Sequence, residues 1–271
     1  MIRDDKRVSS SNWPDLSPDL LRVIYRKLYD TFDFINFRAV CKSWLAAAPL
    51  SEHPPQLPFI LERESFLGSE IKLYSLHTGK TCRIQVPEAR NKLFFGQSQG
   101  YLVTHKSACS NNNSLTLLNP FTRAEVPFPF HGFTFPRRLH LDVRPPYNDF
   151  RRRDFYCLGE GAGAFLGIQR QFHSGTKFWF EVYRLDEELE PPCWVKMSNI
   201  GDLIIFLNDD STGFCLSASD FKGIKGNCIY FLKTMVHDGR SLIGLYELGK
   251  HRSEVIGQLE SEGTWIVPNV F

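Results

Sequence analysis

The chain has 271 residues, a formal net charge of +2 and 42% hydrophobic residues, which predicts a soluble globular protein of one or two domains. So small a charge does not favour a nucleic-acid or membrane partner, and no apolar stretch reaches the roughly 20 residues that span a bilayer. Seven cysteines without a CxxC pair favour buried free thiols in a reducing compartment, the cytoplasm or the nucleus. Residues 1–12 are polar, lack a secretory apolar region and are predicted to be disordered.

Residues 13–50 are predicted to form a small helical unit. Apolar residues recur three or four positions apart over a first helix, at Leu20, Leu21, Ile24 and Leu28. Ser17 and Pro18 suit the N-cap and the first position of that helix. A second helical run has the same spacing, at Phe34, Phe37, Val40, Cys41 and Trp44. About 36 residues cannot bury this much apolar surface alone, so the remainder must meet the rest of the chain or another protein.

The rest of the chain is predicted to be β-rich after a linker. Residues 51–58 contain three prolines, which cannot continue a helix. Residues 59–271 then show short apolar runs between turn residues, which predict strands at 59–61, 71–76, 82–86, 101–105 and 114–118. The expected fold class is therefore α+β multidomain, with a helical unit before an all-β domain.

A loose repeat suggests the architecture of the β domain. The segments around Thr78 and Thr122 match each other 44 residues apart, and those at Tyr183 and Tyr246 resemble their first strands. This period is typical of propeller blades, of which residues 59–271 could hold about four or five. The ring would then be either small or incomplete, and a general antiparallel sandwich is the alternative.

No pattern of residues predicts a catalytic, cofactor or metal site. The glycine-rich segment at residues 159–163 lacks the following helix of a phosphate loop, and the histidines never have metal-site spacing. An enzyme is therefore not expected. The densest basic stretch is either a solvated loop or a patch for an acidic protein substrate. Its candidate residues are Arg137, Arg138, Arg151, Arg152 and Arg153.

The helical unit resembles the F-box from Trp13 to Trp44, without an internal gap. The Leu-Ser-Pro-Asp-Leu-Leu opening and the Arg-x-Val-Cys-Lys-x-Trp ending carry this resemblance. It implies docking on a Skp-type adaptor, which joins the chain to a cullin–RING ubiquitin ligase as a non-catalytic receptor for an unknown protein substrate. The residues expected to face the adaptor, or to pack beneath those that do, are Leu16, Pro18, Leu20, Leu21, Ile24, Leu28, Val40, Cys41 and Trp44.

The C-terminal part resembles plant F-box proteins that carry domain of unknown function 295, a kelch-like or propeller-like region. The resemblance lies in three segments of that region and in its end, at residues 201–206, 217–221, 226–231 and 265–268. Members of that family usually carry about two further blades where this chain has only residues 127–177, so the resemblance implies a shortened middle. Two functions remain open: a ligase receptor, and an interaction protein without a ligase role that titrates adaptor or substrate.

Overall fold

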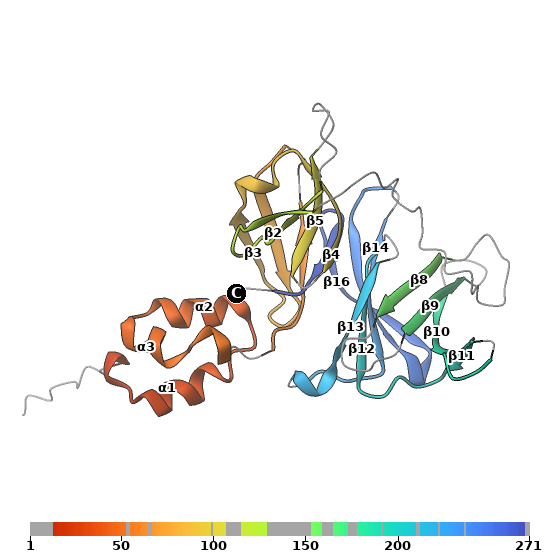
Figure 1. The fold of residues 1–271 in the computed structure, drawn as a ribbon, viewed down its shortest axis with the longest axis horizontal. Helices are drawn as coiled ribbons and strands as arrows, with labels where there is room; N and C mark the ends of the chain where they lie inside the picture. The colour runs from red at the N-terminus through yellow and green to blue at the C-terminus, as the bar shows by residue number, and fades with distance from the viewer. Residues whose placement is uncertain are drawn as a thin grey trace, which may run out of the picture. The chain divides into compact units, whose positions relative to one another are not determined.

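The computed structural model forms two compact units, one of residues 1–56 and one of residues 57–270. Figure 1 shows helices in the first unit and sheets in the second. The described residues are 13–52, 55–63, 65, 67–98, 100–106, 115–128, 153–158, 165–172, 178–190, 192–209, 212–221, 223–235 and 237–268. The segment of residues 1–12, for which the sequence predicts disorder, lies outside them.

The helical unit contains three α-helices, α1 (Pro18–Tyr25), α2 (Thr31–Ala39) and α3 (Lys42–Ala47), between two short 3-10 helices, η1 (Trp13–Asp15) and η2 (Leu50–Glu52). The predicted start of α1 is confirmed, because the Ser17 side chain accepts a hydrogen bond from the Leu20 amide at 3.4 Å and Pro18 opens the helix. Asp30 caps α2 by accepting hydrogen bonds from the amides of Phe32 and Asp33, at 2.9 and 3.3 Å.

The expectation that one helix carries the run from Phe34 to Trp44 is wrong. Cys41 adopts an extended backbone, with φ −164° and ψ 175°, and separates α2 from α3. The chain can therefore fold back, and the ring of Trp44 lies 4.5 Å from that of Phe37, centroid to centroid. The apolar spacing of three or four residues did not reveal this break, because the two separate helices both turn their apolar residues toward one core.

The described part of the second unit is mostly β and forms four sheets arranged like propeller blades, as predicted. Sheet A has the order β17 (Gly263–Ile266), β1 (Phe59–Glu62), β2 (Glu70–Ser75), β3 (Thr81–Gln85). Sheet B follows the chain through β4 (Lys92–Ser98), β5 (Tyr101–Lys106), β6 (Leu115–Leu118) and β7 (Glu125–Phe128). Short 3-10 helices, η3 (Pro87–Ala89), η4 (Ala218–Asp220) and η5 (Leu248–Lys250), lie between strands.

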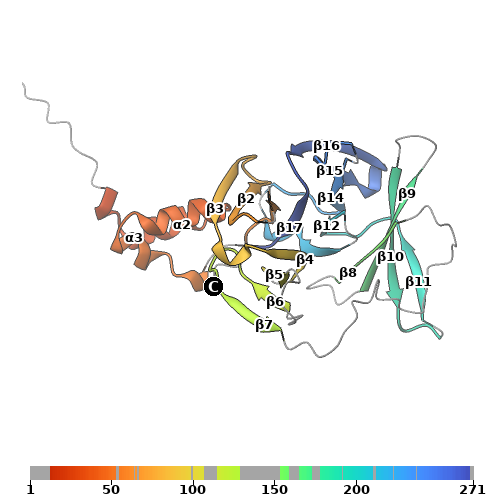
Figure 2. The same ribbon diagram turned by 90° about the horizontal axis from the view of Figure 1, so that it is seen from above.

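Sheets C and D complete the unit (Figure 2). Sheet C consists of β8 (Arg153–Leu158), β9 (Phe165–Phe172), β10 (Phe178–Asp186) and β11 (Cys193–Met197). Sheet D has the order β13 (Gly213–Ser217), β12 (Leu203–Leu207), β14 (Cys228–Thr234), β15 (Ser241–Glu247), β16 (Arg252–Leu259). Its strands β12 and β14 run parallel, which departs from the otherwise antiparallel pairing expected for such sheets.

The sequence repeat corresponds to a repeated turn. After β2, the Gly79 amide donates to the Ser75 carbonyl and the Ser75 amide to the Lys80 carbonyl, both at 2.9 Å. The same pair of bonds follows β6. The Arg123 amide donates to the Asn119 carbonyl at 2.8 Å, and the Asn119 amide donates to the Ala124 carbonyl at 2.9 Å. Gly79 and Arg123 both have positive φ angles, 67° and 64°. Tyr183 in β10 and Tyr246 in β15 likewise lie in the strand before an outermost strand, β11 or β16.

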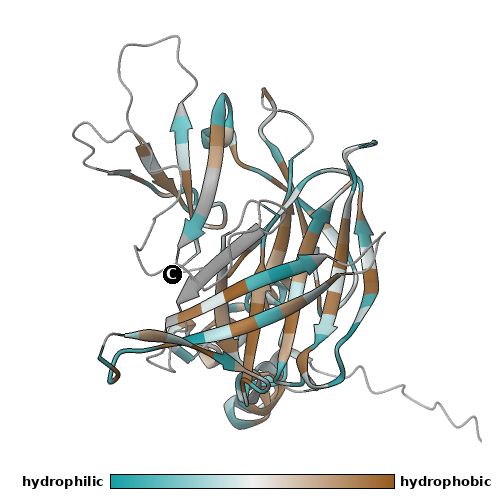
Figure 3. Cartoon of the chain, turned by 90° about the vertical axis from the view of Figure 1, so that its right-hand side faces the viewer, coloured by the Kyte–Doolittle hydropathy of each residue, from teal (hydrophilic) through white to brown (hydrophobic). Residues whose placement is uncertain are grey.

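Alternating side chains pack the sheets in the order B, A, D, C. One face of sheet A meets sheet B, where Phe59 lies 6.1 Å from Phe121. Its other face contributes Ile60 and Trp265 to a core with one face of sheet D. The opposite face of sheet D packs on sheet C, with Phe180 5.2 Å from Phe231. The alternation of hydrophobic and hydrophilic residues along the strands is visible in Figure 3.

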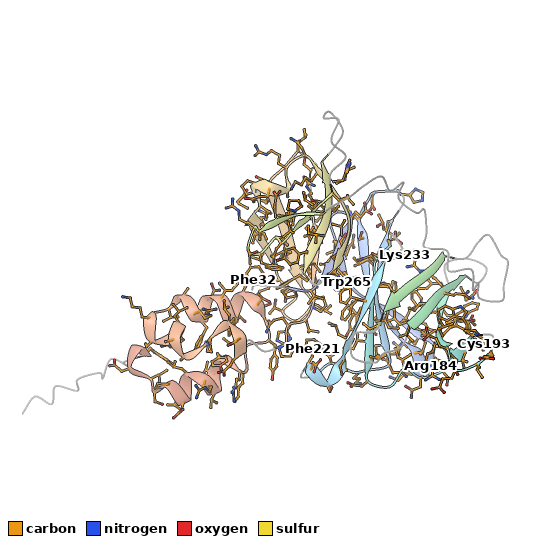
Figure 4. The ribbon with its side chains drawn as sticks, in the orientation of Figure 1. Phe32, Arg184, Cys193, Phe221, Lys233 and Trp265 are labelled. Carbon is orange, nitrogen blue, oxygen red and sulfur yellow. The ribbon has the colours of Figure 1, made fainter. Side chains whose placement is uncertain are left out.

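The strand β17 joins the C-terminal part of the chain to the first strand of the unit. It pairs antiparallel with β1, from Phe59 opposite Ile266 to Glu62 opposite Gly263. Trp265, labelled in Figure 4, is fully buried, and its indole N–H donates to the Leu207 carbonyl at 3.1 Å. The strand thereby ties sheet A to sheet D.

Candidate functional site

The core of the helical unit is small and aromatic. Its buried members are Leu21, Tyr25, Phe34, Phe37, Ala47 and Ala48. Tyr25 lies 6.1 Å from Phe34 and 6.3 Å from Phe37, and Trp44 covers Phe37 from α3. The indole N–H of Trp44 donates to the carbonyl of Trp13 at 3.2 Å, which holds the entry segment against α3.

The surface of the unit carries many large apolar side chains. Those with at least 40% of their surface exposed are Trp13, Leu20, Val23, Ile35, Val40 and Leu45. Leu20 and Val23 are three residues apart on α1 and so lie on the same side of that helix. Scattered exposed apolar residues are ordinary, but six within about 35 residues are typical of an interaction surface.

The predicted docking residues divide into exposed and supporting ones. Leu20 and Val40 are each 53% exposed, and Pro18 is exposed at the start of α1. Leu21 is buried in the core, where it supports the helices instead. The other predicted members are partly buried: Leu16, Ile24, Leu28, Cys41 and Trp44.

Four exposed apolar residues were absent from the predicted set: Trp13, Val23, Ile35 and Leu45. Val23 continues the face of Leu20 at a spacing of three, which is a signal that the sequence carries. Leu45 follows Trp44 directly, and only the packing of α3 shows which of these two neighbours points outward.

A polar cluster fixes the end of the helical unit. The Tyr25 hydroxyl donates a hydrogen bond to Glu52, and Arg26 contacts the same carboxylate at 3.4 Å. The hydrogen bond from Tyr25 is the largest influence on the pKa of Glu52 and lowers it below its ordinary value. Desolvation opposes this effect, and the hydrogen bond from Arg26 adds to the lowering. Gln56 extends the attachment by donating to the Leu28 carbonyl at 3.2 Å.

This cluster predicts a pH-dependent contribution to stability. Because folding lowers the pKa of Glu52 from 4.5, its contribution is present above that value and is lost as the pH falls through the folded pKa. Glu52→Gln should therefore lower the melting temperature slightly at pH 7, by an amount that shrinks toward pH 3. The effect should be small because Glu52 is exposed.

Thermal unfolding of the full chain at several pH values measures this difference. Glu187→Gln, at an exposed position of the β unit, is the control and should show no such trend. A Glu52→Gln deficit that stays constant from pH 7 to pH 3 would contradict the assignment.

The predicted basic patch is mostly beyond the described residues. Arg137, Arg138, Arg151 and Arg152 lie outside them, and Arg153 is the first residue of β8, where it pairs in register with Arg170. Five cysteines are seen as free thiols, Cys41, Cys82, Cys193, Cys215 and Cys228. Of these, Cys215 and Cys228 are buried as expected, whereas Cys41 and Cys82 are partly exposed and Cys193 is exposed on β11.

Within the described ranges, no three His, Cys, Asp or Glu side chains gather in a way that could hold a metal ion. Among the helices that the structure describes, none has the length and apolarity needed to cross a membrane.

Curated relatives with similar sequences are plant F-box proteins. The F-box protein SKIP23 of Arabidopsis thaliana is 28% identical over 158 residues, which are 55% of this chain and 37% of that protein. F-box protein At2g17036 from the same plant is 30% identical over 157 residues, 54% of this chain and 36% of its own length. Putative F-box protein At3g25750 is 27% identical over 121 residues, 44% of this chain and 31% of that protein. The chain thus covers about a third of the length of these relatives. No solved structure matches it significantly.

A family model also matches the β unit. The KIB1-4 beta-propeller model aligns with residues 73–150 and 137–252, which together are more than half of the chain. The aligned segments include strands of all four sheets, from β2 in sheet A to β15 in sheet D. The chain therefore belongs to the KIB1-4 beta-propeller family.

Proposed function

We propose that this chain is an F-box substrate receptor of a cullin–RING (SCF-type) ubiquitin ligase. The helical unit docks on a Skp-type adaptor, and the β unit binds the target protein. In this role the chain catalyses no reaction and needs no cofactor, and it works in the cytoplasm or the nucleus.

The exposed apolar surface of the helical unit is the observation that carries this proposal. The core of this unit contains only six buried residues, and Leu20, Val23 and Val40 remain exposed to solvent. Such exposed apolar side chains lower the solubility of a protein unless a partner covers them. The names of the relatives and the resemblance of residues 13–44 to the F-box support a Skp-type adaptor as that partner. The kelch-like domain of unknown function 295 remains our proposed description of the β unit.

Calorimetric titration of the purified full chain with a purified Skp-type adaptor tests the docking step. We expect a dissociation constant of about 1 µM or tighter, since a helical unit with several apolar anchors can supply the roughly 8 kcal/mol that this affinity needs. Absence of binding at tens of micromolar would reject the proposal.

A second candidate is an interaction protein that titrates adaptor or substrate without a ligase role. The shortened middle of the β unit, which the resemblance to that plant family implies, favours keeping this candidate. A reconstituted ligase separates the two: a receptor leads to ubiquitin transfer onto a protein captured from plant extract, whereas a titrating protein captures adaptor or target without transfer. The stretch from Arg137 to Arg153 stays our predicted substrate surface.

A further inference from the structure

Ser17 carries an exposed hydroxyl group in the middle of the expected docking residues. It lies between Leu16 and Pro18, two members of that set, and is itself exposed. Its hydroxyl oxygen accepts a hydrogen bond from the Leu20 amide at 3.4 Å, and Leu20 is a docking residue that is 53% exposed. A group attached to this oxygen would therefore lie within the docking surface.

The residue after Ser17 suits one class of modifying enzyme. Although the chain has 16 prolines, Ser17 and Pro18 form its only serine-proline or threonine-proline pair. Proline-directed protein kinases phosphorylate serine or threonine where proline follows directly. Proline disfavours the helical conformation in the residue before it, so such a site is extended. Ser17 has this conformation, with φ −61° and ψ 146°, and thus matches both the sequence and the backbone that these kinases require.

The hydroxyl of Ser17 is also accessible to an enzyme. Its hydrogen bond of 3.4 Å is longer than the roughly 2.9 Å typical of N–H···O bonds. Residues 17–20 are all exposed, and the first buried residue of α1 is Leu21. Because helix ends fray, the first turn of α1 can straighten in a kinase without opening the core of the helical unit.

We propose that Ser17 is a phosphorylation site for a proline-directed kinase and that its phosphate blocks docking of the adaptor. This regulation rests on the proposed function, since it acts on the same surface. In the reaction, the Ser17 hydroxyl oxygen bonds to the γ-phosphorus of ATP, and the bond from that phosphorus to the oxygen bridging to the β-phosphorus breaks. ADP leaves, and the hydroxyl proton passes to a base of the kinase.

A phosphate on Ser17 opposes docking through its charge. It adds a charge of about −1.5 to −2 in a short segment that already exposes the carboxylates of Asp15 and Asp19. Arg22 contacts Asp19 at 3.6 Å and so already has an anionic partner. An apolar partner surface that covers Leu20 would remove water from the phosphate, which is unfavourable for a charged group.

The same phosphate should leave the helix intact. Negative groups are favourable at a helix N-terminus, and the phosphate still offers oxygen acceptors to the Leu20 amide. Loss of docking can therefore be separated from loss of the fold. Aspartate and asparagine cap helices about as well as serine does, so Ser17→Asp adds a charge and Ser17→Asn adds none, while both retain the cap.

Kinase treatment of the purified full chain tests the modification. A cyclin-dependent kinase and, separately, a mitogen-activated protein kinase are supplied with ATP, and mass spectrometry locates the phosphate. We expect a single phosphate, on Ser17, in the wild type and none in Ser17→Asn, because no other serine or threonine precedes a proline. A wild type that takes up no phosphate on Ser17 from either kinase would overturn the proposal.

Calorimetric titration with a purified Skp-type adaptor tests the block. The phosphorylated chain should bind at least about tenfold more weakly than the unmodified chain. Ser17→Asp should bind more weakly than Ser17→Asn, which should bind like the wild type. Circular dichroism should show the same helical content in all of them.

The outcomes separate this inference from the proposed function. If the phosphorylated chain binds the adaptor as tightly as the unmodified chain, or if it loses binding because it unfolds, the inference is wrong and the receptor proposal stands. If the unmodified chain does not bind the adaptor at all, the proposed function fails, and the regulation fails with it.

Discussion

Trp265→Ala should lower the free energy of unfolding of the β unit by about 4 kcal/mol, the usual cost of truncating a buried tryptophan. Trp265 is fully buried, lies 5.1 Å from Phe206 and packs edge-on against Tyr230. Its removal also leaves the Leu207 carbonyl without the indole donor, which adds an unsatisfied buried group. Since domains are stable by only about 5–15 kcal/mol, such a loss is a large fraction of the total.

Two further variants separate the causes of this loss. Trp265→Phe keeps an aromatic ring but no donor, so it should cost roughly half as much. Trp194→Ala removes a tryptophan from the outermost strand of sheet C, where it is only partly buried, and should cost least. Thermal or urea unfolding of the full chain measures all three. A Trp194→Ala variant less stable than Trp265→Ala would contradict the view that β17 secures the unit.

The part of the fold that local chemistry decides was predictable from the sequence. The start of α1 was predictable because it depends on two local preferences. The Ser17 side chain accepts a hydrogen bond from a backbone amide at the N-cap, and Pro18 suits the first helical position, where no amide hydrogen is needed. The five predicted strands correspond to β1, β2, β3, β5 and β6 within one or two residues. The 44-residue repeat was visible because its turns reuse one hydrogen-bonding pattern, in which Thr78 and Thr122 each accept from the amide two residues on.

Features that depend on contacts distant in the sequence were not predictable. The break at Cys41 has no proline or glycine to mark it, and follows from the packing of Trp44 on Phe37. The strand β4 was missed, and the insertion of β12 beside β14 in parallel cannot be read from periodicity. The candidate site shows the same limit: Leu20 and Leu21 are neighbours of one type, yet one is exposed and the other buried.

This difference between neighbours makes the docking surface testable. Leu20→Asp and Val40→Asp change side chains that are exposed in the helical unit, so neither should unfold it. A buried interface leucine contributes about 2 kcal/mol or more, and placing a carboxylate in its pocket adds a desolvation cost. Each variant should therefore weaken binding of a Skp-type adaptor at least 30-fold, an order-of-magnitude estimate from that energy.

Controls distinguish loss of the surface from loss of the fold. Val255→Asp changes a valine in the β unit that is even more exposed than Val40, 63% against 53%, and should bind the adaptor like the wild type. Leu21→Ala and Trp44→Ala remove side chains that pack in or against the helical core, so any loss that they cause should be accompanied by a lower melting temperature. Calorimetric titration with circular dichroism of each variant gives both quantities. If the folded Leu20→Asp and Val40→Asp variants bind as tightly as the wild type, the adaptor does not use this surface and the receptor proposal loses the observation on which it rests.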